Sequence, residues 1–264
     1  MTPPRSKMSG LSTVELLVSL TVAGLVMAGV LSFLIAYRRV TIQEELSAAL
    51  EANLNVGLRR LSESLRNAGF GVPTTNLSTW VPWVSGFTTN PTIINGGTAP
   101  DTLLLASCTT QPVATLTANA ASGATVLTVN STSGFNTTNR RLITIGVSEY
   151  AQVTNIGSGT ITIDTDPTTS GNQGLSQAYY IGTPICRVDV VTYSVDTNNY
   201  RLLLDRNDGA GPQILLDGIN NLKVTSITAK QYQITLTARS EQPDPETQAF
   251  LTRRMQLAVT LRSP

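Results

Sequence analysis

The sequence of 264 residues contains no histidine, which removes the commonest general base and the commonest zinc ligand from consideration. Without histidine, neither a Ser-His-Asp nor a Cys-His catalytic arrangement can be built. Charged residues make up only 13% of the chain, about half the usual share, and the net charge is +1. This balance argues against a broad nucleic-acid-binding face. Thr, Ser, Asn and Gly are abundant instead, a composition that suits an exported β protein better than a cytosolic enzyme.

What the chain does contain is one long apolar run, Leu16–Ala36, which is long enough to span a bilayer as a helix. Tyr37, Arg38 and Arg39 follow it as an aromatic and basic boundary. Basic residues lie on both sides of the run, so the positive-inside rule does not settle its orientation. One carboxylate, Glu15, stands at the entrance, although a charge costs roughly 2.5–3.5 kcal/mol at the centre of a membrane helix.

Three interpretations of this run differ in what they explain. A cleaved secretory signal has an apolar region of about 7–15 residues, which is shorter than the run observed. A plain single-span anchor explains the run but not Glu15. The third interpretation explains both, because "SGLSTVELLVSL" resembles the type III signal of type IV pilins and type II secretion pseudopilins. In that signal a short basic leader ends in Gly, an apolar residue follows, and the fifth mature residue is Glu. Gly10, Leu11 and Glu15 hold these positions here, with Leu11 where the family more often has Phe.

The resemblance implies that residues 1–10 are a prepilin leader. It further implies that a prepilin peptidase cleaves between Gly10 and Leu11, and that Leu11 is then N-methylated. In the assembled filament, the carboxylate of Glu15 would face the α-amino group of Leu11 on a neighbouring subunit, and a paired charge is tolerable in a dry environment. The alternative for Glu15 is a helix-end carboxylate near the positive N-terminal dipole that reaches toward the membrane interface.

Helical periodicity continues beyond the apolar run. Leucines recur at steps of three or four and predict one apolar stripe on an otherwise charged helix, formed by Leu46, Leu50, Leu54, Leu58, Leu61 and Leu65. Gly69, Gly71 and Pro73 then supply a stop signal. We expect one rod from about Ser12 to Ala68, with residues 11–36 transmembrane and residues 37–69 amphipathic. Its ending, "LRNAGFG", resembles the "LRxAG" ending of PilW-type minor pilins. For the leucine stripe, the alternative to packing on a sheet is a coiled-coil or bundle helix.

After Pro73 the sequence becomes rich in predicted strands. The segment "DTLLLASC", Asp101–Cys108, is typical of a buried strand. Five later segments resemble the C-terminal sheet of PilW-type minor pilins and pseudopilin J relatives: Val191–Val195, Tyr200–Leu204, Leu215–Val224, Tyr232–Ala238 and Met255–Leu261. The resemblance implies an α+β protein with the type IV pilin fold, in which the long N-terminal helix packs on an antiparallel β-sheet head.

Residues 114–181 have no counterpart in that pattern. We expect them to form an inserted small β module, while residues 70–113 and 182–264 form the pilin β head. The alternative is a long, embellished loop of the same sheet. Export to an oxidising compartment favours a disulfide between Cys108 and Cys186, which would tie the two ends of the module together. The alternative for these cysteines is two buried thiols.

Little in the sequence points to a chemical site. The segment "DRNDGAG", Asp205–Gly211, invites a calcium interpretation but departs from the EF-hand loop pattern. Asp205 and Asp208 are better explained as turn residues, as are Asp164 and Asp166. We therefore expect no catalytic residues, no metal site and no cofactor, and we expect the protein not to be an enzyme.

The resemblance implies a structural subunit, a minor pilin that primes assembly of a type IV pilus or caps it and presents an adhesive or DNA-uptake surface. The expected partners are the prepilin peptidase, other major and minor pilins, the pilus assembly platform, and a surface ligand or DNA at the tip. The chain would cross the bacterial inner membrane once before assembly and belong to an extracellular pilus afterwards. The alternatives are a minor pseudopilin of a type II secretion system and a membrane-anchored surface lectin or enzyme.

Overall fold

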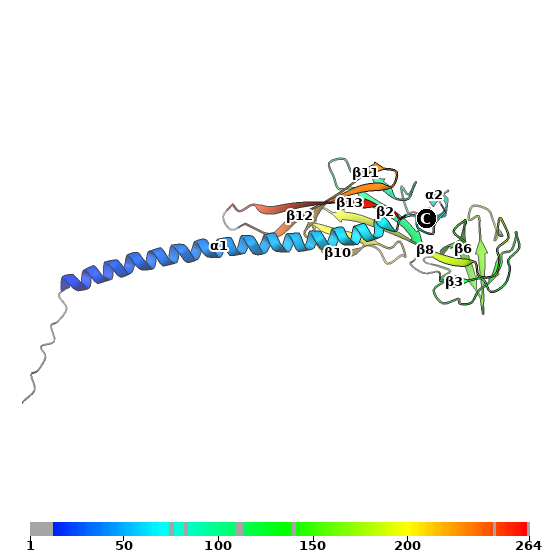
Figure 1. The fold of residues 1–264 in the computed structure, drawn as a ribbon, viewed down its shortest axis with the longest axis horizontal. Helices are drawn as coiled ribbons and strands as arrows, with labels where there is room; N and C mark the ends of the chain where they lie inside the picture. Colours follow the sequence, from blue (N-terminus) through cyan, green and yellow to red (C-terminus); the bar gives the residue numbers. More distant parts are fainter. Residues whose placement is uncertain are drawn as a thin grey trace, which may run out of the picture.

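The computed structural model describes residues 13–73, 77–81, 84–108, 113–138, 141–244 and 247–262. Within them the fold is α+β, with one long helix, α1 (Thr13–Arg66), and antiparallel β-sheets. The helix has 54 residues and is therefore about 80 Å long at a rise of 1.5 Å per residue. Its first half projects alone, and its second half is embedded in a β-rich head (Figure 1).

The predicted rod is confirmed as one continuous helix that ends two residues earlier than expected, at Arg66. Gly69 and Gly71 follow with φ angles of 79° and 67°, which glycine adopts readily and other residues do not. A side chain at Gly71 would also place its Cβ 2.5 Å from the Cβ of Cys108. The stop signal therefore serves a second purpose, because it lets the chain pass close to a strand of the head.

The remaining elements are strands of 2 to 13 residues and one helical turn. In chain order they are α2 (Leu77–Trp80), β1 (Thr92–Ile94), β2 (Thr102–Cys108), β3 (Ala114–Thr115), β4 (Val126–Thr128), β5 (Leu142–Ile145), β6 (Glu149–Ile156), β7 (Thr160–Asp164), β8 (Pro184–Asp196), β9 (Arg201–Asp205), β10 (Gln213–Asp217), β11 (Ile219–Thr228), β12 (Gln231–Pro243) and β13 (Phe250–Thr260).

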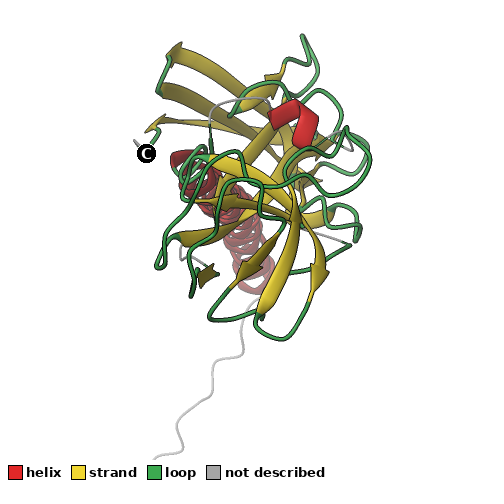
Figure 2. Cartoon of the chain, turned by 90° about the vertical axis from the view of Figure 1, so that its right-hand side faces the viewer, coloured by secondary structure: helices red, strands yellow, loops and turns green. Residues whose placement is uncertain are grey.

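Strand β8 organises the larger sheet, because its two halves pair with different partners. Its C-terminal half pairs with β2 on one side and β9 on the other, and β10 extends the sheet beyond β9. Its N-terminal half pairs with β3 and β5, and the sheet continues through β6 and β7 to β4. One strand, which itself lies outside residues 114–181, thus pairs both with strands of the head and with strands of that predicted module. The module lies at the end of the molecule opposite the free half of α1 (Figure 1), and Figure 2 looks at that end with α1 receding behind the strands.

A separate sheet is formed by β11, β12 and β13. The expectation that Leu215–Val224 is one strand, and that the five late segments share one sheet, is wrong. Gly218 breaks the segment with a φ of 76°, so that β10 joins β9 in the larger sheet while β11 joins β12 in the smaller one. This break between β10 and β11 favours glycine, because a Cβ at position 218 would lie 3.1 Å from the carbonyl oxygen of Arg239.

The buried residues of the described chain fall into three groups. The first joins the second half of α1 to β11, β12 and β13 and to one face of β2, β8 and β9. The second fills the module. The third covers the other face of β2 with Trp80, Val81 and Phe87, and it also takes Leu142 and Tyr150 from the module. The module therefore has a core of its own and also shares one with the head.

The leucine stripe of α1, Leu50 to Leu65, lies at the centre of the first core. Leu54, Leu61 and Leu65 have no exposed surface, while Leu46, nearer the apolar first half of α1, is half-buried. The predicted charged face is solvent-exposed, as at Glu51 and Arg59. Gly57 lies beside this stripe, and a Cβ there would lie only 2.8 Å from the side chains of Leu216 and Leu236. The absence of a side chain at this position therefore lets α1 approach both sheets closely.

Replacing Leu61 by alanine should lower the free energy of unfolding of the head by about 3 kcal/mol, because the change empties a fully enclosed site. Val56→Ala, at a position on the same helix that is 51% exposed, is the control and should cost less than about 0.5 kcal/mol. Denaturant titration of both full-length variants in detergent measures the difference. Equal losses would mean that the stripe does not hold α1 to the sheets.

Candidate membrane and assembly site

The first half of α1 presents apolar side chains on every side. Its most apolar 18-residue window has a mean hydropathy of 2.3 and no buried residue. Leu25, Phe33 and Leu20 are 75%, 69% and 68% exposed. This segment is long and apolar enough to cross a membrane, and a helix that is apolar all round requires either lipid or other apolar helices around it.

The polar side chains within this apolar segment are satisfied by the helix itself. The hydroxyl of Ser19 donates to the carbonyl oxygen of Leu16 at 2.9 Å, and that of Thr21 donates to Val18 at 2.8 Å. Ser32 bonds in the same way to Ala28 at 2.9 Å. These bonds reduce the cost of placing hydroxyl groups in a medium without water.

Of the residues that the sequence singles out for processing and assembly, one is described. Glu15 lies in the first turn of α1, on the same face as Val18, Val22 and Val26. Gly10 and Leu11 lie outside the described residues. Glu15 therefore stands where the helix dipole favours a negative charge, at the end of an apolar face.

The β12–β13 hairpin anchors the head to α1 just beyond the apolar segment. The Nε2 amide of Gln43 donates to Oδ2 of Asp244 at 2.6 Å, and the guanidinium of Arg253 donates to the hydroxyl of Ser47 at 2.8 Å. These partners are 201 and 206 residues apart in the chain, so no local pattern could predict them. The contacts couple the orientation of the head to that of the apolar first half of α1.

The structure joins Cys108 and Cys186 in a disulfide, as expected, with their Cα atoms 5.6 Å apart. Cys108 is the last residue of β2 and pairs with Val188 of β8. Cys186 lies two residues before Val188 in β8, opposite Thr144 of β5. The bond therefore joins the end of β2 to the part of β8 that pairs with β5, where head and module meet.

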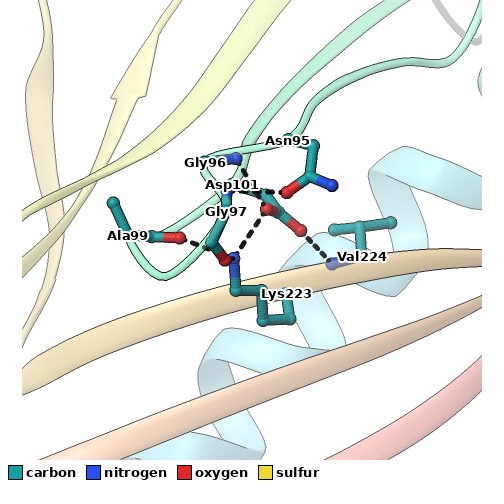
Figure 3. Close-up of polar contacts among 7 residues, drawn as sticks. All are labelled: Asn95, Gly96, Gly97, Ala99, Asp101, Lys223 and Val224. Carbon is teal, nitrogen blue, oxygen red and sulfur yellow. Dashed lines mark hydrogen bonds and ion pairs between the residues drawn. The ribbon is translucent and has the colours of Figure 1, made fainter.

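A buried carboxylate links the two sheets of the head (Figure 3). Asp101, whose side chain is 5% exposed, accepts from Lys223 Nζ at 2.9 Å, from the Val224 N–H at 2.9 Å and from the Gly96 N–H at 3.0 Å. Lys223 also donates to the carbonyl oxygens of Gly97 and Ala99. Asp101 precedes β2 and Lys223 lies in β11, so this network ties the start of the larger sheet to the smaller one.

The hydrogen bonds at Asp101 decide its protonation state. Burial by itself would raise the pKa of its carboxyl group, but the bonds from Val224, Lys223 and Gly96 outweigh burial and leave the pKa below its ordinary value of 3.8. The folded state thus favours the ionised form. The stabilisation is complete above the ordinary pKa and is lost as the pH falls through the lower pKa of the folded protein.

The aspartates of the Asp205–Gly211 segment accept backbone hydrogen bonds within a turn. Oδ1 of Asp205 accepts from the N–H of Asn207 at 2.8 Å, and Oδ1 of Asp208 accepts from the N–H of Ala210 at 3.2 Å. Asp164 and Asp166 accept from backbone N–H groups in the same manner. Within the described ranges, no group of three or more Cys, Asp or Glu side chains is placed to hold a metal ion.

In comparisons with known proteins, no family model, no curated protein and no solved structure matches the chain.

Replacing Asp101 by asparagine should lower the free energy of unfolding at neutral pH by about 2 kcal/mol. The bonds from Lys223 Nζ and from the Val224 N–H to a charged carboxylate would be replaced by weaker contacts with a neutral amide. The gap between wild type and variant should shrink as the pH falls below 3.8, where the wild-type carboxylate is neutralised. Denaturant titrations across the acid range measure it. Asp217→Asn, which breaks the exposed ion pair with Arg201, is the matched control and should cost less than about 1 kcal/mol. A gap that stays constant in acid would show that ionisation of Asp101 is not the cause.

Proposed function

We propose that this protein is a minor pilin, a membrane-anchored subunit that primes or caps a type IV pilus. One observation carries the proposal. A single unbroken helix is apolar and exposed on all sides in its first half, has Glu15 in its first turn, and packs a leucine stripe on antiparallel sheets in its second half. The sequence places a Gly10–Leu11 junction just before this helix. The type IV pilin fold, the prepilin leader and the N-methylated Leu11 belong to the same proposal.

In this proposal the apolar half of α1 has two successive environments. Before assembly it crosses the inner membrane, with the head outside the bilayer. During assembly it leaves the lipid and packs among the helices of other pilins, which bury the same apolar surface. The exchange requires a helix without a fixed polar face, and the self-satisfied hydroxyls of Ser19, Thr21 and Ser32 meet that requirement.

Glu15 would set the axial offset between neighbouring subunits in the filament. In the proposed filament the α-amino group of a neighbouring Leu11 would compensate the carboxylate in a dry environment, where the loss of either partner is costly. Because this contact forms only when the two subunits have the correct axial offset, it favours one arrangement over others. The prepilin peptidase, other pilins and the assembly platform are the partners that this role requires.

The position of the module supports a place at the tip. It lies at the end of the molecule farthest from the apolar half of α1 (Figure 1). Tyr180 and Ile181 on its surface are 71% and 66% exposed. Two backbone bonds hold the turn that carries them: the Gly182 N–H donates to the carbonyl oxygen of Leu116, and the Thr183 N–H donates to that of Tyr180. A rigid, exposed, uncharged surface suits contact with another protein or a solid surface. A pseudopilin of a type II secretion system uses the same helix architecture, so the site of assembly, pilus or secretion piston, separates these two roles.

The first test of this proposal is the mature N-terminus. Mass spectrometry of membrane-extracted protein should find a chain that begins at Leu11 with a methylated α-amino group. Gly10→Val should leave the leader in place, because the peptidase accepts only a small residue before the cut. Finding Met1 on filament-associated protein would contradict the proposal.

The second test concerns Glu15. The Glu15→Ala variant should insert into the membrane normally but enter filaments about tenfold less or worse, since an unpaired amine in a dry interface costs several kcal/mol. Immunoblots of membrane and sheared filament fractions measure both steps. Glu44→Ala, at an exposed carboxylate beyond the apolar segment, is the control and should assemble as wild type does. Normal incorporation of the Glu15 variant would favour a simple interfacial role for this carboxylate.

A further inference from the structure

The head contains a cleft of about 360 Å³ where the ends of its two sheets meet. One wall comes from the turns before β9 and after β10, and the other comes from the adjoining ends of β12 and β13. We call it the Arg239 cleft, after one of its lining residues. Its other principal lining residues are Tyr200, Arg201, Asp217, Glu241 and Phe250.

The guanidinium group of Arg239 is held between two aromatic rings. Its central carbon lies 3.6 Å from the centroid of the Phe250 ring and 4.3 Å from that of Tyr200. Stacking of this kind fixes a planar guanidinium, which is otherwise a flexible group. A side chain that is already ordered loses little conformational entropy when a ligand binds to it.

Although it is fixed, this guanidinium has no acceptor in the part of the chain that the structure describes: its contacts there are the two rings. The neighbouring Arg201 differs, because its Nε donates to Oδ1 of Asp217 at 2.8 Å. Arginine presents five N–H donors in a rigid fork that matches a carboxylate with two parallel bonds. Arg239 is therefore an ordered donor group that faces a cleft without an internal partner.

The backbone around the stack is also unusual. Tyr200 has a φ of 54°, a left-handed conformation that residues other than glycine seldom adopt. Its carbonyl oxygen accepts from the N–H of Ile219, and the N–H of Arg239 donates to the carbonyl oxygen of Gly218 at 2.7 Å. These bonds fasten the turns on one wall of the cleft to β11 and β12, so the ring of Tyr200 and the guanidinium are positioned by the main chain.

The charges of the cleft narrow the class of ligand. Two guanidinium groups, of Arg201 and Arg239, are balanced by two carboxylates, of Asp217 and Glu241. A phosphate dianion or a nucleic acid gains no net attraction from such a set. A ligand with one carboxylate and several hydroxyl groups fits better, because the fork takes the carboxylate while the protein carboxylates accept hydroxyl protons.

We propose that the Arg239 cleft binds a sugar acid, that is, a saccharide unit bearing a single carboxylate. Arg239 holds the carboxylate through two parallel N–H bonds, Asp217 and Glu241 accept from ring hydroxyls, and Phe250, which is 40% exposed, packs against the apolar C–H groups. This binding role uses head residues alone and does not depend on the assignment of the protein as a pilin.

The test is calorimetric titration of the full-length protein in detergent with sodium glucuronate, compared with glucose, sodium acetate and inorganic phosphate. Glucuronate should bind at least about tenfold more tightly than each of the other three, since each lacks either the carboxylate or the hydroxyls or adds a second charge. Arg239→Gln should weaken glucuronate binding by about tenfold or more and abolish the preference over glucose. Arg239→Lys, which keeps the charge without the fork, should give a smaller loss of affinity than Arg239→Gln.

Arg254→Gln is the matched control, because it removes one positive charge from β13 outside the lining of the cleft and should leave binding unchanged. Thermal unfolding without ligand checks each variant, and if the Gln variant is unfolded, the Lys variant decides. The proposal is overturned if the wild type shows no saturable glucuronate binding, or if acetate or phosphate binds equally well. It is also overturned if both folded Arg239 variants bind as wild type does, or if Arg254→Gln loses as much affinity as Arg239→Gln.

Discussion

Burial of the leucine stripe between two sheets is the contact on which the rest of this structure depends. The second half of α1 stays attached to the head because Leu50–Leu65 is removed from water, and the helix covers one face of each of the two sheets. Gly57 sets the depth of this packing, because its missing side chain leaves room for Leu216 from one sheet and Leu236 from the other. The helix thus serves as the common core of two sheets that do not otherwise form one layer.

The head also connects α1 to the module at the far end of the molecule. Three connections do this in series. Gln43 and Ser47 bind the β12–β13 hairpin close to the apolar half of the helix. Asp101 and Lys223 join the two sheets, and β8 pairs with strands of both the head and the module. The disulfide of Cys108 with Cys186 closes the last joint. These contacts form a continuous series from α1 to the module.

The scarcity of charge in the sequence has a structural counterpart. The few charged groups that are buried are fully engaged, as Asp101 is by two backbone N–H groups and a lysine. Others shape turns, as Asp205 does. Arg239 stands apart, since it is ordered by aromatic rings and has no acceptor among the described residues. The proposed ligand would bind this ordered donor group at the cleft.

The sequence by itself determined the features that are periodic or local: the length of α1, its leucine stripe, its glycine stop at Gly69 and Gly71, and the buried strand that ends at Cys108. These follow from side-chain spacing and backbone conformation, which act over a few residues. Only the tertiary structure decided that Gly218 splits one apparent strand between two sheets, that β8 serves both head and module, and that Arg239 stacks between Tyr200 and Phe250. Such outcomes depend on partners tens or hundreds of residues away, whose identity is set by which surfaces pack together and leaves no mark in the local pattern.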